Sequence, residues 1–191
     1  MADLPRLLAT LREVLRALDD LAAPSMLVGG VALAAWAPPR ATVDLDLAIS
    51  VKAADLPAVG AFIGRRVGGL SSMHPVRFRD GTTLQRVVVQ RPEGEVTVDL
   101  VLAEGAFLEA AMRRRVRQAV GDLDLSVATP EDLVVMKLRA GRRQDLVDIR
   151  SLAEARRLDR GYVRRWAGRL KLMGRLARAL PVRRGRRGSR R

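Results

Sequence analysis

MLVGGVALAAWAPPRATVDLDLAIS, residues 26–50, is the stretch that decides the fold of this chain. A short apolar run stops at Gly29-Gly30, and a helix-forming segment ended by two prolines follows. The chain then continues as a strand in which Asp44 and Asp46 alternate with aliphatic residues. Because side chains two apart on a strand share a face, we expect both carboxylates to project together.

The two halves of this stretch predict a site for phosphoryl transfer. Carboxylates held side by side repel each other unless a cation lies between them, and hard divalent ions such as Mg2+ suit that position. Gly29 and Gly30 lack a Cβ, so the backbone can approach a ligand there, and the N–H groups that open the next helix can receive an anion. Phosphate beside carboxylate-bound metal is what phosphoryl transfer requires.

A third carboxylate, Asp99, lies in an almost wholly apolar strand at 96–102. A lone buried carboxylate is costly, so either a pair of backbone N–H groups satisfies it or it shares the cation of Asp44 and Asp46. We favour the second alternative. A second DLDL string, at 122–125, lacks the upstream glycines and begins in a turn, so we assign it to structure.

Hydrophobic periodicity and turn signals predict an α+β chain. We expect helices over 4–21, 31–37, 53–66, 106–115, 130–140, from 144 onward and, as a single helix, over 162–180; strands are expected over 26–28, 43–47, 76–79, 84–90, 96–102, 116–120 and 123–127. Thr129-Pro130 reads as the cap and first residue of a helix.

Composition narrows the function classes. The chain has 191 residues, 48% of them apolar, no cysteine and a net charge of +14. These values favour a globular protein of a reducing compartment, and the absence of a signal peptide or of a long apolar run predicts a cytoplasmic protein without a membrane span. Residues 183–191 carry six arginines, which form either a solvated basic tail or a phosphate contact. A P-loop is excluded because no G-K-[ST] motif occurs, and His74 is the only histidine.

In their order, the motifs resemble those of the nucleotidyltransferase superfamily of the DNA polymerase beta type, and most closely the bacterial abortive-infection AbiE-type toxins and their stand-alone relatives. The matching segments are LVGG at 27–30, RAT at 40–42, VDLDL at 43–47 and the stretch 127–152. The resemblance implies a nucleotidyltransferase fold: a mixed β-sheet flanked by helices in a core over 1–128, a C-terminal helical subdomain over 129–180 and a basic, disordered tail over 181–191.

The resemblance also implies roles for individual residues. Gly29, Gly30, Arg40 and Thr42 would bind the nucleotide. The expected metal ligands for two Mg2+ ions, or for Mn2+ in their place, are Asp44, Asp46 and Asp99. Asp99 would otherwise serve as the base, and the remaining catalytic candidates are Lys137 with a later acid, which is either Asp145 or Asp148.

The expected reaction is attack of a hydroxyl on the α-phosphate of an NTP, with release of pyrophosphate. The acceptor is expected to be RNA, and tRNA in particular, in a toxin–antitoxin or phage-defence setting with an antitoxin protein as a partner. The basic tail, the run 113–117 and the C-terminal helix would supply phosphate contacts. Alternatives are nucleotidylation of a small molecule such as an aminoglycoside or of a protein, and a catalytically silent binding module.

Overall fold

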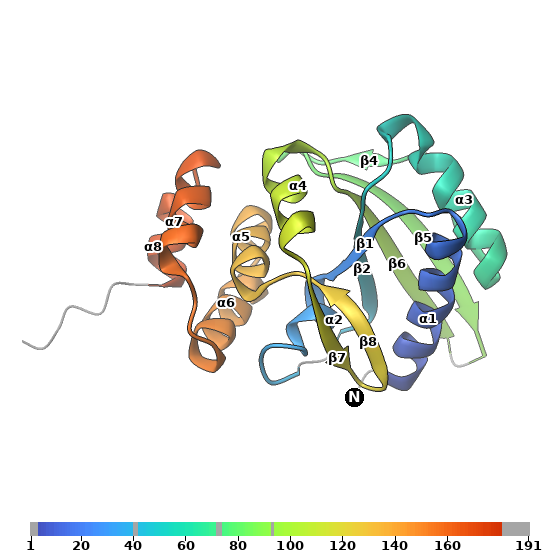
Figure 1. Ribbon diagram of the computed structural model, residues 1–191, viewed down its shortest axis with the longest axis horizontal. Coiled ribbons are helices and arrows are strands. Elements are labelled where there is room, and N and C mark those ends of the chain that lie inside the picture. The colour runs from blue at the N-terminus through green and yellow to red at the C-terminus, as the bar shows by residue number, and fades with distance from the viewer. Residues whose placement is uncertain (1–3, 40–41, 72–73, 93, 181–191) are drawn as a thin grey trace, which may run out of the picture.

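A mixed eight-stranded β-sheet forms the centre of the computed structural model, which describes residues 4–39, 42–71, 74–92 and 94–180 (Figure 1). The strand order is β3-β5-β6-β2-β1-β8-β7, and β4 pairs with β5. The strands are β1 (Ser25–Val28), β2 (Asp44–Ile49), β3 (Gly69–Ser71), β4 (Val76–Arg77), β5 (Thr83–Arg91), β6 (Gly94–Leu102), β7 (Val116–Val120) and β8 (Leu123–Val127). The expected fold class, a mixed sheet flanked by helices, is confirmed.

Helices cover the sheet on both sides. Figure 1 shows α1 and α3 together on one side of the sheet, whereas α5 to α8 form a separate group beyond the other side. The helices are α1 (Leu4–Asp20), α2 (Gly29–Leu33), the short 3-10 helix η1 (Ala53–Asp55), α3 (Leu56–Val67), α4 (Gly105–Arg114), α5 (Pro130–Ala140), α6 (Arg143–Ala155), α7 (Arg160–Arg169) and α8 (Met173–Ala179). Across the described ranges, no helix is long and apolar enough to cross a membrane.

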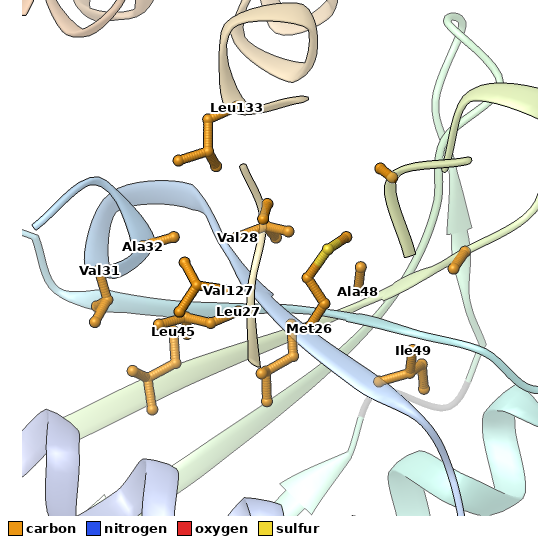
Figure 2. Close-up of a cluster of buried hydrophobic side chains, with 14 of the residues drawn as sticks. Met26, Leu27, Val28, Val31, Ala32, Leu45, Ala48, Ile49, Val127 and Leu133 are labelled. Carbon is orange, nitrogen blue, oxygen red and sulfur yellow. The ribbon is translucent and has the colours of Figure 1, made fainter. Parts of the chain in front are cut away.

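The apolar residues of the opening stretch anchor the sheet to its helices. Figure 2 shows Met26, Leu27 and Val28 of β1 grouped with Leu45 of β2, Val127 of β8 and, farther along, Leu133 of α5. These side chains are all at least nine-tenths buried. Leu45 and Leu47 turn inward and are fully buried, so the intervening acidic residues are directed to the opposite face.

A buried polar network joins the C-terminal helices α5 and α7 to α4. Asp132, which is fully buried, accepts hydrogen bonds from Tyr162 Oη (2.5 Å), Thr129 Oγ1 (2.7 Å) and Arg114 Nε (3.3 Å). The Arg114 guanidinium also lies 3.9 Å from the centre of the Tyr162 ring. Burial and the hydrogen bond to Asp132 raise the pKa of Tyr162, so its hydroxyl stays a donor. Helices α4, α5 and α7 therefore share one cluster of satisfied polar groups.

Three local expectations are corrected. The single helix predicted over 162–180 is two helices, because Lys171 adopts a left-handed φ of 58° between α7 and α8. Helix α2 begins at Gly29 and has five residues, so it starts earlier and is shorter than expected. The strand β3 was not anticipated; it pairs with β5 through Gly69, where a Cβ would lie 2.6 Å from the Val88 carbonyl oxygen.

Candidate active site

The pairing of strands brings the three predicted carboxylates together. In the parallel ladder between β2 and β6, Asp46 lies opposite Asp99 and Asp44 lies opposite Thr97. Asp44 and Asp46 are partly buried, whereas Asp99 is buried. Residues 53 positions apart in the sequence therefore present their carboxylates to one site on the same face of the sheet.

Asp46 has the most perturbed ionisation of the three. Burial, then the charge of Asp99 and then that of Asp44 raise the pKa of Asp46 to about 6. A hydrogen bond from the backbone N–H of Gly30 and the charge of Lys137 oppose this rise without cancelling it. The site consequently holds more negative charge than its own residues neutralise.

Gly29 is required by the carboxylate beside it. Its φ is +68°, and a Cβ at this position would lie 1.9 Å from Asp46 Oδ2. Any other residue would be strained and would displace the Asp46 side chain. The glycine pair was expected to let the backbone approach a ligand; in this structure the group that approaches it is Asp46.

Arg86 is a member of the site that the sequence did not reveal. Its Nε and Nη2 donate to the two carboxylate oxygens of Asp99 at 2.7 and 2.8 Å. Neither alternative considered for Asp99, a pair of backbone N–H groups or a shared cation, included this partner. A sequence signal for this pair existed. Arg91 pairs with Gly94 where β5 and β6 meet, and five residues along each strand from that pair Arg86 stands opposite Asp99.

Lys137 lies in a second buried charge cluster, formed by α5 and α6. Its Nζ is 2.5 Å from Asp148 Oδ2 and 3.8 Å from Asp145 Oδ1, and all three side chains are buried. Asp145 also accepts a hydrogen bond from the backbone N–H of Arg142 and so caps α6. Of the two later acids between which the sequence did not choose, Asp148 makes the close contact with Lys137.

Of the remaining predicted residues, some lie within the described part of the chain and others lie outside it. Thr42 Oγ1 donates a long hydrogen bond of 3.4 Å to the Asp44 carbonyl oxygen, just before β2. Arg40 and the tail 181–191 lie outside the described residues. In the second DLDL string, Asp122 and Asp124 form exposed ion pairs with Arg12 and Arg117, in agreement with a structural role.

The side chains of the site bear on whether it can hold a metal ion. Among the residues that the structure describes, no three His, Asp or Glu side chains are grouped as a ready metal centre, and Arg86 holds both oxygens of Asp99. Asp44 and Asp46 do suit a hard cation, because both are carboxylates, and burial together with the charges of Asp99 and Asp44 raises the pKa of Asp46. The residues present therefore fit a divalent ion held mainly by this pair.

Comparisons with known proteins identify a matching family and structures of similar fold. The family model described as nucleotidyl transferase AbiEii toxin, type IV TA system, matches residues 13–182. The solution structure of the antibiotic-resistance factor ANT(2″)-Ia is similar with a TM-score of 0.57 and 13% identity, over 91% of this chain and 96% of that one.

Two further solved structures are similar to this chain. The crystal structure of ANT(2″)-Ia in complex with adenylyl-2″-tobramycin gives a TM-score of 0.57 and 14% identity, over 87% of this chain and 97% of that one. JHP933 from Helicobacter pylori gives a TM-score of 0.49 and 18% identity, over 90% and 74%. No curated protein sequence matches the chain. At these identities the two ANT(2″)-Ia structures support the fold alone.

The raised pKa of Asp46 predicts a pH-dependent effect of its removal. A carboxyl group whose folded-state pKa lies above its unfolded value destabilises the fold once it ionises, so the penalty is absent below about pH 4 and complete above about pH 6. In metal-free buffer, Asp46→Asn should raise the free energy of unfolding by an amount that grows across this range to on the order of 1–3 kcal/mol. Urea unfolding at a series of pH values measures the difference.

The matched control for this experiment is Asp124→Asn, which removes an exposed carboxylate of the second DLDL string. Its difference from the unaltered protein should not change between pH 4 and pH 6 by a comparable amount. If the difference in the free energy of unfolding between Asp46→Asn and the unaltered protein did not depend on pH, the charge of Asp46 would not be the cause of the destabilisation.

Proposed function

The chain belongs to the AbiEii nucleotidyl transferase toxin family of type IV toxin–antitoxin systems and is therefore a nucleotidyltransferase. We propose that it transfers an NMP from an NTP to a hydroxyl group of RNA with the help of Mg2+. Membership of a toxin–antitoxin family implies an NTP substrate and an antitoxin counterpart. The acceptor, the metal and the residue roles given below are our proposal.

The observation that carries the proposal is the meeting of two charge clusters. The carboxylates of β2 and β6 provide negative charge, and Lys137, held by Asp148, lies close enough to lower the pKa of Asp46. A triphosphate bound between them would place its negative charge toward the ammonium group. Such fixed charges cost no reorganisation during the reaction, which is why they stabilise a phosphoryl transition state effectively.

The chain's own residues then divide the work. The oxygen of the acceptor hydroxyl forms a bond to the α-phosphorus while the bond to the β-phosphate bridging oxygen breaks and pyrophosphate leaves. Asp99 receives the hydroxyl proton, and Arg86 holds both of its oxygens in a fixed orientation. Lys137 stabilises charge on the phosphates, and the Gly30 N–H orients Asp46. Positioning and electrostatics supply most of the rate in such chemistry.

Asp44 and Asp46 would hold the divalent ion, which when bound neutralises charge on the phosphates and on the entering and leaving oxygens. Asp99 would contribute only as far as Arg86 shares it, because the guanidinium occupies both carboxylate oxygens. Arg86 thus limits the negative charge offered to the ion.

Arg86→Ala should tighten the binding of Mn2+ or Mg2+ several-fold, because it frees Asp99 and removes one positive charge from the site. Isothermal titration calorimetry measures this without any turnover. The control is Arg77→Ala, which removes an exposed guanidinium paired with Glu104 and should leave metal affinity unchanged. Unchanged or weaker binding in Arg86→Ala would show that Arg86 does not compete with the ion.

The proposed reaction is tested by label transfer. The protein is incubated with each α-labelled NTP, Mg2+, total RNA, soluble protein and small-molecule acceptors, and the labelled product is identified. Label should enter RNA, and Asp44→Asn combined with Asp46→Asn should abolish the transfer. The matched control, Asp122→Asn with Asp124→Asn, changes the other DLDL string and should retain full activity. Label confined to a protein or to an aminoglycoside would overturn the RNA acceptor.

Lys137→Met should reduce transfer on the order of a hundredfold, the loss that follows removal of one electrostatic stabiliser. Since its removal leaves Asp145 and Asp148 buried without their cation, the variant should also be less stable. The double variant Lys137→Met with Asp148→Asn also removes the buried negative charge of Asp148. Its transfer activity, measured on folded protein, shows whether Lys137 contributes to catalysis or only to folding. The exposed Lys52 gives the control Lys52→Met. Transfer within a few-fold of normal in the folded double variant would exclude a catalytic Lys137.

A further inference from the structure

Three exposed arginines surround a hollow at the corner between α6 and α7. The hollow has a volume of about 400 Å3 and is lined by Ala153, Arg156, Arg157, Leu158 and Arg160. Arg156 and Arg157 follow directly after α6, and Arg160 opens α7. We call this feature the arginine hollow. It belongs to neither of the two charge clusters of the candidate active site.

The arginine hollow is exposed and positively charged, and the guanidinium of one of its arginines, Arg156, lies over the Trp36 ring. Over the described part of the chain, none of its three arginines forms an ion pair with a carboxylate. In the basic run 113–117, which was expected to contact phosphates, three of the four arginines have partners within the protein. Arg114 is bound by Glu131 and Asp132, Arg115 donates to the Met112 carbonyl oxygen, and Arg117 pairs with Asp124. Unpaired guanidinium groups around a concavity are suited to bind phosphate.

An apolar cavity adjoins the arginine hollow and shares Leu158 and Arg160 with it. It has a volume of about 260 Å3, and its other lining residues are Val163, Arg164, Met173, Leu176, Ala177 and Leu180. Phosphate-binding arginines next to an apolar cavity match the two parts of an unstacked nucleotide, its phosphate and its base. An acidic peptide would use the arginines but has no need of the cavity.

The arginine hollow is connected to the candidate active site by two routes. Helix α6 carries Asp148 near its middle and leads to its C-cap Arg156, roughly 12 Å farther along the helix axis at a rise of about 1.5 Å per residue. The Arg156 guanidinium lies 5.8 Å from the centre of the Trp36 ring, in the segment that joins Gly29-Gly30 to Asp44. In Figure 1, α5 and α6 together stand between the sheet and the outer pair α7 and α8.

We propose that the arginine hollow and the adjoining cavity bind a single-stranded segment of nucleic acid, with phosphates on Arg156, Arg157 and Arg160 and a base in the cavity. The inference rests on the proposed function in one respect, that the same strand supplies the hydroxyl acceptor. The binding itself requires no nucleotidyl transfer and is measured separately.

The test uses the full chain and a short fluorescent single-stranded RNA oligonucleotide, with anisotropy recorded at several salt concentrations. Arg156→Ala, Arg157→Ala and Arg160→Ala together should weaken binding at least about tenfold and reduce the salt slope by about 2, as three lost phosphate contacts on a single strand require. The control removes three exposed arginines on α1 and α3 through Arg16→Ala, Arg65→Ala and Arg66→Ala. This control has the same net charge and should bind RNA with nearly unchanged affinity.

Ala177→Leu tests the cavity. Ala177 is exposed and lines the cavity, so a larger side chain fills it without disturbing the core. This variant should weaken binding of the single strand while the salt slope stays the same, because no phosphate contact is lost. Double-stranded RNA and polyglutamate serve as competitors and should displace the oligonucleotide poorly.

Equal losses in the two triple variants would overturn the proposal, since they would show attraction to net charge alone. Effective competition by polyglutamate would overturn it in favour of an acidic protein partner.

Transfer assays separate this inference from the proposed function. An increased KM for RNA with a nearly unchanged kcat in the hollow variant supports both. If RNA binds specifically at the hollow but no label is transferred to it, this inference is supported and the proposed function is contradicted. If the triple variant at the hollow transfers label to RNA at the normal rate with an unaltered KM, the proposed function is supported and this inference is contradicted.

Discussion

The repulsion among three carboxylates on one face of the sheet is the constraint on which the site depends. Strand pairing sets Asp46 opposite Asp99, with Asp44 two residues away on the same strand. Burial first, and then the charges of Asp99 and Asp44, raise the pKa of Asp46 to about 6. The surrounding residues partly offset this charge: Arg86 binds Asp99, the Gly30 N–H binds Asp46, and Lys137 acts from α5. The residual negative charge is what makes a cation a fitting ligand.

The helical half matters to the site because it carries the opposing charge. Lys137 is a buried lysine, and burial of an ammonium group is tolerated only with anionic partners, which Asp148 and Asp145 provide. The Asp132 network then holds α5 against α4 and α7. Lys137 is therefore a fixed charge on a rigid element and not a mobile surface lysine. A fixed charge can stabilise a transition state without first being ordered.

Much of this protein could be predicted from local sequence. The alternation in VDLDL placed Leu45 and Leu47 in the core and the carboxylates together, whereas Val43 lies before β2 and is exposed. Thr129-Pro130 marked the start of α5, where the Thr129 side chain accepts from the Asp132 N–H. The hairpin of β7 and β8 was also predicted at its observed bounds. These features follow from periodicity, capping and turn chemistry, which act between residues close in the chain. The break between α7 and α8 was missed because the apolar pattern continues through it, while Lys171 adopts a left-handed conformation.

By itself, the sequence determined the carboxylate pair, the glycine turn and the classes of element that carry them. Only the tertiary structure decided the partner of each charge. Asp99 pairs with Arg86 because the register of β5 and β6 sets them opposite each other, and Asp148 approaches Lys137 more closely than Asp145 does because Asp145 caps α6. The same holds for the arginines: those at 114 and 117 meet carboxylates, whereas those at 156, 157 and 160 surround a hollow. Local propensity acts within a few residues, but electrostatic partners are set by the packing of distant segments, which no short sequence pattern encodes.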